Sequence, residues 1–145
     1  MIRRLALLVV AGLLLSACGT VSAVSAMRTW VNASNFHSSV KTLTTDVRHS
    51  ASALRDVTMS SASLHTVCGV LLFDTESANA SLPTPDNQST ALLSKAYTNI
   101  GMGANQCYRA GANPAARAAA LLSLAKGLGV LAEATVRVDV VSLSH

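Results

Sequence analysis

The sequence predicts an all-α protein, an antiparallel up-down-up-down four-helix bundle with a long first helix. Apolar residues recur at spacings of three and four in four separate segments, the pattern of helices that each bury one face. Prolines and capping residues separate these segments. Half of the residues are hydrophobic but only 3% are aromatic, so the core must consist largely of Ala, Val and Leu, which suits closely packed helices.

The first helix is expected to begin soon after Thr20 and to be long. Its apolar positions, with one serine among them, are Ala33, Phe36, Val40, Leu43, Val47, Ser50, Leu54 and Val57. Lys41, Arg48 and Arg55 repeat every seven residues away from this face. We therefore expect the three cations to be exposed to solvent.

The second helix is expected after a break in the pattern near residues 58–61, where Ser60 or Ser61 can cap a new start. Its apolar face contains Leu64, Val67, Cys68, Leu71, Thr75 and Ala78. The turn Leu82-Pro83-Thr84-Pro85-Asp86 follows, and its first proline cannot continue a helix. In this turn we expect Thr84 to cap the third helix, with Pro85 at its first position.

The third helix is expected to bury Leu93, Ala96, Ile100, Gly103 and Cys107 and to stop at Gly111. Asn113-Pro114 repeats the cap-then-proline start for the fourth helix. The apolar stripe of this helix is broad and contains Leu121, Leu124, Leu128, Leu131 and Val138, flanked by Leu122, Ala125 and Ala132. The last ten residues fit a frayed helix end better than an extended tail.

Cys68 and Cys107 are expected to form a disulfide between the second and third helices. The midpoint of their positions lies within a few residues of the 83–86 turn, so a hairpin about this turn places them at the same level. The bridge would close a loop of about 40 residues, for which chain entropy gives roughly 4 kcal/mol. Two free buried thiols are the alternative.

The beginning of the chain has the pattern of a secretory signal. Two arginines at positions 3 and 4 precede an unbroken apolar run over residues 5–15, and small residues follow just before Cys18. The run of 11 residues is shorter than the roughly 20 that cross a bilayer, so a permanent transmembrane helix is not expected here.

The segment Leu15-Ser16-Ala17-Cys18 resembles the lipobox of bacterial lipoproteins. The resemblance implies that the chain is cut before Cys18, that this cysteine is acylated, and that the lipid holds the protein on the outer side of the cytoplasmic membrane. The whole chain resembles small uncharacterised helical lipoproteins of actinobacterial type, a likeness that implies no activity. An ordinary signal peptide with a chance cysteine is the alternative.

The expected organisation is a removed signal peptide at residues 1–17, a lipidated N-terminus and short tether at 18–23, and one helical domain at 24–145. Removal of the signal leaves 128 residues, enough for one buried core. The remaining nine Lys and Arg face seven Asp and Glu, without a basic run, so nucleic acid is not expected as a partner.

No motif for catalysis, a cofactor or a metal stands out. His65 and Cys68 are spaced for one helix face, but zinc needs three or four ligands. The seven acids are scattered, and Asp74 and Glu76 point to different sides of a helix, although acids from different helices can still converge. Gly101-Met102-Gly103 and Gly127-Leu128-Gly129 are interpreted as close contacts between helices. Trp30 is expected in the core rather than at the membrane interface.

The sequence therefore predicts a non-catalytic, lipid-anchored protein of the cell envelope that acts as an interaction or structural module. Its partners would be the membrane, through the lipid on Cys18, and an envelope protein. The alternative function is a carrier of a small apolar ligand or lipid in a cavity between the helices, since the small residues of the last two helices can leave space there.

Overall fold

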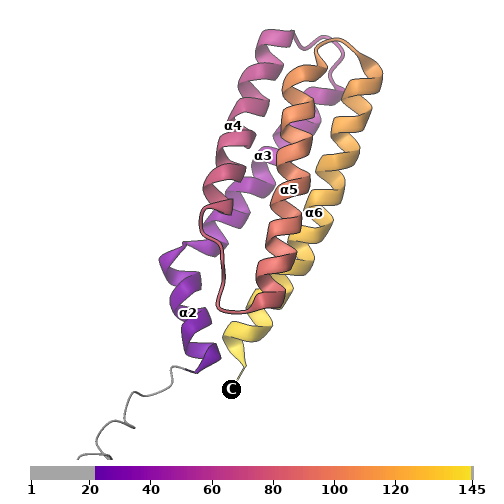
Figure 1. Cartoon of the computed structure of the whole chain (residues 1–145). Helices are drawn as coiled ribbons and strands as arrows, with labels where there is room; N and C mark the ends of the chain where they lie inside the picture. Colours follow the sequence, from indigo (N-terminus) through magenta and orange to yellow (C-terminus); the bar gives the residue numbers. More distant parts are fainter. Residues whose placement is uncertain (1–21, 145) are drawn as a thin grey trace, which may run out of the picture.

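A computed structural model describes residues 22–144. These residues form five helices and no strand: α2 (Ala23–Ala33), α3 (Phe36–Arg55), α4 (Ser61–Asn79), α5 (Asn87–Ala110) and α6 (Pro114–Leu143). The all-α class is confirmed. Figure 1 shows α3 to α6 side by side, with neighbouring helices running in opposite directions and the short α2 at one end.

The expected count of four helices is wrong, because the long first helix is two helices. Ser34 and Asn35 separate α2 from α3, and Asn35 has a φ of 49°, a left-handed conformation that interrupts the helical hydrogen bonds. The apolar spacing continues across this break, which is why periodicity alone did not reveal it. The disulfide consequently joins the third and fourth of the described helices rather than the second and third.

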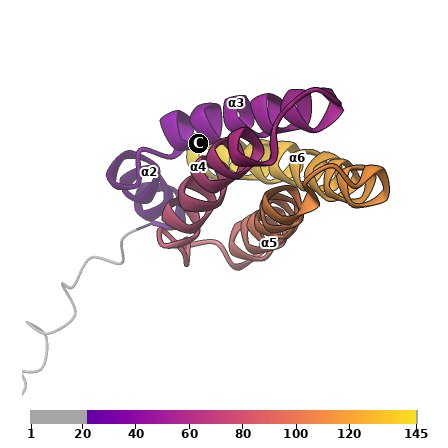
Figure 2. The ribbon, with the colours of Figure 1, turned by 90° about the horizontal axis from the view of Figure 1, so that it is seen from above.

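The short helix α2 packs across the end of α6 (Figure 2). Arg28 Nε donates a hydrogen bond of 2.7 Å to the carbonyl oxygen of Ser142. Trp30 is partly buried, packs against Phe36 with ring centroids 5.3 Å apart and ring planes tilted by 46°, and donates from Nε1 to the carbonyl oxygen of Ser81. Trp30 therefore fixes α2 against the end of α4, as a residue at the edge of the core.

Most helix starts lie where the sequence indicates. Ser60 caps α4, and Asn113 caps α6 with Pro114 as its first residue. The expected cap at Thr84 is wrong: Asp86 caps α5 by accepting from Ser89 N at 2.8 Å. The hydroxyl of Thr84 instead donates to the carbonyl oxygen of Asp86, so it stabilises the turn before the cap.

The helices α5 and α6 meet most closely at two glycines. A Cβ at Gly103 would lie 2.7 Å from a methyl carbon of Leu124, and one at Gly127 would lie 2.5 Å from Ile100 Cγ1. Both glycines are close-contact points, as expected, and the space beside them is filled. Gly129 is different, because a Cβ there would meet nothing within 4 Å.

Candidate functional site

The helix α6 is apolar on two sides. One side faces the core and buries Leu124, Leu131 and Val138. The opposite side is exposed, and on it Lys126 and Glu133 border a strip of apolar and small residues that we call the α6 outer face. It consists of Ala118, Leu122, Ala125, Gly129, Ala132, Val136, Val140 and Leu143. The sequence showed one broad stripe on this helix; the structure divides it between the core and solvent.

The large residues of the α6 outer face are far more exposed than apolar side chains usually are. Leu122 is 74% exposed, Val136 63%, Val140 56% and Leu143 66%. Contiguous apolar surface of this kind marks interaction sites, whereas single exposed apolar residues do not. The α6 outer face therefore has the composition of an interface that the single chain leaves uncovered.

By length and composition α6 also satisfies the criteria for a membrane-spanning helix. Core helices of soluble proteins satisfy the same criteria, and α6 packs lengthwise against α5 and at its sides against α3 and α2 (Figure 2). Only 28% of its most apolar window is buried, less than a core helix of that composition would show. The excess apolar surface lies on the α6 outer face.

A groove runs beside the α6 outer face, between α3 and α6. Two hollows of about 380 and 190 Å³ form it. Its apolar lining residues include Val40, Val47, Leu121, Leu128 and Val136. Arg48 borders both hollows and Arg55 one of them, so two of the three cations expected to be exposed lie at the α3 edge of this groove.

The disulfide between Cys68 and Cys107 is present, with the Cα atoms 5.8 Å apart and both residues fully buried. His65 does not share a metal site with Cys68. Its ring stacks on that of Tyr108, with centroids 4.4 Å apart and planes inclined by 13°. Among residues 22–144 no three His, Cys, Asp or Glu side chains converge as metal ligands.

Two carboxylates from different helices do converge, which the sequence could not show. Asp74 of α4 lies close enough to Asp46 of α3 to affect the pKa of that carboxyl. Burial, followed by the neighbouring side chain and charge of Asp74, raises the pKa of Asp46 above its usual range. Asp74 also borders a polar hollow of about 270 Å³ between the two helices, lined mainly by serines. A proton on Asp46 removes the repulsion between the two carboxyls, so this contact depends on pH.

Two buried polar atoms near this pair lack hydrogen-bond partners among the described residues. They are Asp46 Oδ2 and Ser50 Oγ, one helical turn apart on α3. Ser50, the one polar position of the expected apolar face, is fully buried. Two histidines of α3 lie apart from each other: His37 Nε2 is 3.8 Å from Asp139 Oδ1 near the start of the helix, and the charge of His49 lowers the pKa of Asp46.

Another acid, Asp86, connects the start of α5 to α6. Asp86 caps α5 and accepts two hydrogen bonds from the guanidinium of Arg137 on α6, at 3.1 and 3.0 Å. These bonds, together with those from Ser89, hold the pKa of the Asp86 carboxyl far below its usual range despite its partial burial. These hydrogen bonds connect the start of α5 to the last turns of α6, which is a structural role.

Comparisons with known proteins found no match to this chain among protein-family models, curated proteins or solved structures. The functional assignment therefore depends on the residues themselves. Cys18, the expected lipidation site, lies outside the described residues.

Proposed function

We propose that the protein is a non-catalytic, lipid-anchored interaction module of the bacterial cell envelope. Residues 1–17 direct export, and lipid on Cys18 holds the domain on the outer side of the cytoplasmic membrane. The observation that carries the proposal is the α6 outer face, whose four large side chains are each more than half exposed. A surface of that kind is stabilised when a partner covers it.

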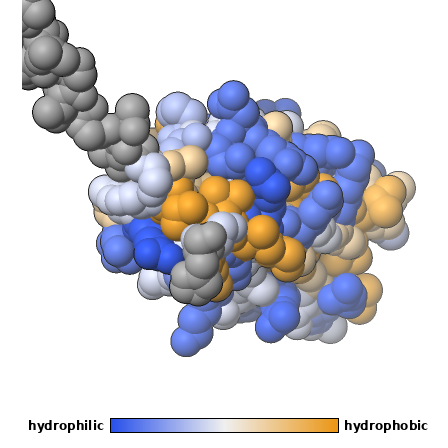
Figure 3. Space-filling view, turned by 90° about the horizontal axis from the view of Figure 1, so that it is seen from below, coloured by the Kyte–Doolittle hydropathy of each residue, from blue (hydrophilic) through white to orange (hydrophobic). Residues whose placement is uncertain are grey.

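The position of the anchor supports this arrangement. The helix α2 begins at Ala23, five residues after Cys18, and lies at the same end of the bundle as the last turn of α6 (Figure 1). Figure 3 shows apolar surface gathered at this end. The lipid therefore keeps the domain close to the bilayer, while most of the α6 outer face lies further along the bundle and can meet another envelope component.

The anchor is tested by fractionation of cells that express the full chain or its Cys18→Ala variant. The lipid supplies the membrane attachment in this proposal, so the variant should leave the membrane fraction. Retention of the variant in membranes would contradict the anchor.

The interaction surface is tested with a photo-crosslinking residue in place of Val136, and with one in place of Thr98 of α5 as a control. Both positions are exposed, but only Val136 belongs to the α6 outer face. Crosslinks to a defined protein from Val136 and none from Thr98 are expected in the intact envelope. Equal labelling from the two positions would remove the α6 outer face as an interaction site.

The second candidate is a carrier of a single-chain anionic amphiphile in the α3–α6 groove. The apolar lining and the bordering Arg48 and Arg55 favour it, since a guanidinium binds carboxylate and phosphate groups well. A carrier must bind a fluorescent fatty acid, and Ala132→Trp should fill the groove and abolish that binding. A chain that binds no fatty acid is not a carrier of this kind.

A further inference from the structure

We infer that the partner of the α6 outer face is a second copy of this chain, bound through the same face with the two α6 helices antiparallel. The inference rests on the proposed function, because it names the partner of the surface that carries it. The pattern of side-chain sizes and the pattern of charges on α6 both lead to this conclusion.

The α6 outer face has the seven-residue repeat of two helices packed along their length. One row consists of Leu122, Gly129, Val136 and Leu143, and the other of Ala118, Ala125 and Ala132. In an antiparallel pair one row meets the partner's other row. When Gly129 lies opposite the partner's Ala132, Val136 lies opposite the partner's Ala125 and Leu143 opposite the partner's Ala118, while Leu122 lies opposite the partner's Asp139. Val136 and Leu143 then each meet a small side chain, so the helices can approach closely.

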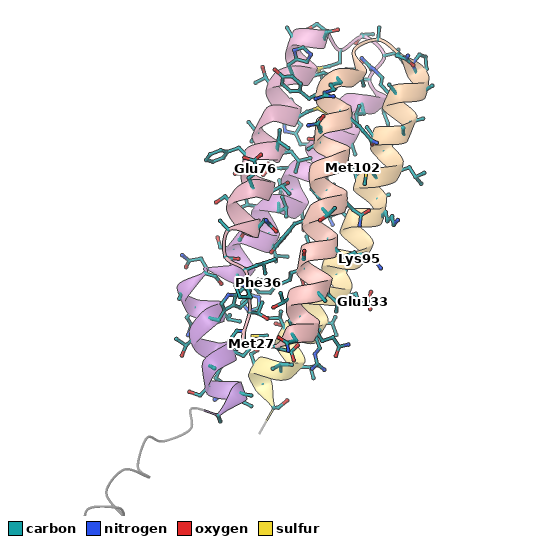
Figure 4. All side chains as sticks on the ribbon, viewed as in Figure 1. Met27, Phe36, Glu76, Lys95, Met102 and Glu133 are labelled. Carbon is teal, nitrogen blue, oxygen red and sulfur yellow. A yellow bond between two sulfur atoms is a disulfide. The ribbon has the colours of Figure 1, made fainter. Side chains whose placement is uncertain are left out.

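The charges beside the face are self-complementary in the same register. Lys126 and Glu133 lie two helical turns apart along one edge of the α6 outer face, and both are exposed. Neither has an oppositely charged group within ion-pair distance among residues 22–144. In Figure 4 Glu133 lies on the outer side of α6. The antiparallel register places Lys126 beside the partner's Glu133, and the two-fold axis repeats this pair.

A parallel pair fits these residues less well. Around a two-fold axis parallel to the helices each row meets itself, and the edge with Lys126 and Glu133 faces the partner's opposite edge, which carries no charge and offers no ion pair. A parallel pair would also set Val136 against Val136 and leave the three alanines facing one another, so neither sizes nor charges would be complementary. Only the antiparallel arrangement makes side-chain sizes and charges complementary.

The geometry is compatible with two anchored chains. A two-fold axis perpendicular to α6 leaves both α3 helices, with their exposed cations, on the same side of the dimer. Both N-terminal tethers can then reach one bilayer when the dimer lies along its surface. Confinement to a membrane also raises the effective concentration of the two copies, which favours a pair of modest intrinsic affinity.

The test uses two full-length copies with different affinity tags, expressed in the same cells and purified through one tag in mild detergent. Wild-type copies should purify together. Lys126→Glu in both copies, or Glu133→Lys in both, should weaken this association about tenfold, because each change turns two attractive pairs into two repulsive ones. Glu76→Lys, the same charge reversal at an exposed position of α4, should change nothing (Figure 4).

The decisive arm combines a Lys126→Glu copy with a Glu133→Lys copy. Position 126 of each copy then meets the opposite charge at position 133 of the other copy, so co-purification should return to the wild-type level. This recovery would also show that both variants fold. Failure of wild-type copies to purify together, or of the mixed pair to recover, overturns the inference. Specific crosslinks from Val136 to a different protein would in that case leave the proposed function intact.

Discussion

The two glycines of the fourth long helix, Gly127 and Gly129, provide a matched pair for testing the packing of α5 against α6. They lie two residues apart in α6, so alanine at either position gains the same helix propensity, about 1 kcal/mol. Their surroundings differ: Gly127 touches Ile100 of α5, and Gly129 has open space beside it. We expect Gly129→Ala to stabilise the chain and Gly127→Ala to destabilise it.

The magnitude follows from the contacts at Gly127. A Cβ there would lie 2.5 Å from Ile100 Cγ1 and 2.9 Å from the backbone nitrogen of Ile100. A side-chain atom can move away by rotation, but the backbone nitrogen cannot, so the helices must separate by roughly 0.5–1 Å to reach normal van der Waals distances. Overpacking of this kind costs about 3 kcal/mol at the upper end. The net expectation for Gly127→Ala is a loss of about 2 kcal/mol after the gain in propensity.

Urea unfolding of the full chain, followed by far-UV circular dichroism with the disulfide intact, measures both variants. The free energies of unfolding should differ by about 3 kcal/mol, with wild type between them. The comparison is made at two protein concentrations, so that any self-association through Gly129 is separated from folding. Equal free energies for the two alanine variants would refute the close packing at Gly127.

Three further predictions concern polar contacts. Asp86→Ala should lower the free energy of unfolding by about 1 kcal/mol at pH 7, because the helix cap is lost. The folded-state pKa of Asp86 is lowered, so the stability that this carboxylate contributes is present above its unfolded pKa. In thermal melts the difference from wild type should therefore shrink as pH falls below about 4. Asp46→Asn should raise the melting temperature at pH 8 more than at pH 4, because the raised pKa of Asp46 means that its contribution to stability is lost as pH rises through that pKa. Equal shifts at both pH values would contradict the raised pKa. Arg117 is 6% exposed and donates hydrogen bonds to the carbonyl oxygens of Gly111, Leu54, Asp56 and Met59. Arg117→Met should therefore lower the free energy of urea unfolding by about 3 kcal/mol. Arg109 is exposed, so the control Arg109→Met should have almost no effect.

Local signals in the sequence were sufficient for much of the fold. Ser60 and Asn113 mark helix starts because their side chains accept hydrogen bonds from backbone N–H groups of the first turn, and Gly111 marks an end through its positive φ of 52°. The Cys68–Cys107 pairing followed from counting residues about a turn. These features depend on neighbours along the chain, which is why sequence alone revealed them.

The features that sequence missed depend on contacts between distant segments. Asp46 and Asp74 are 28 residues apart and meet only because α3 and α4 are antiparallel neighbours. Arg117 gives no sign in the sequence that it will bind the end of α3. The broad apolar stripe of α6 was visible, but periodicity could not show which side of it α3 and α5 would cover and which side would stay exposed.

The most direct test of the antiparallel dimer is a disulfide between two copies at the centre of the α6 outer face. A Gly129→Cys copy and an Ala132→Cys copy, each full length and differently tagged, are expressed together and oxidised in membranes. The antiparallel register places these two Cα atoms within the roughly 4.4–6.8 Å that a disulfide requires. We predict a crosslinked heterodimer on a non-reducing gel, and none when Phe73→Cys, an exposed apolar position of α4, replaces both changes. Absence of the product between the Gly129→Cys and Ala132→Cys copies, or equal crosslinking through Phe73→Cys, would contradict an antiparallel dimer through the α6 outer face.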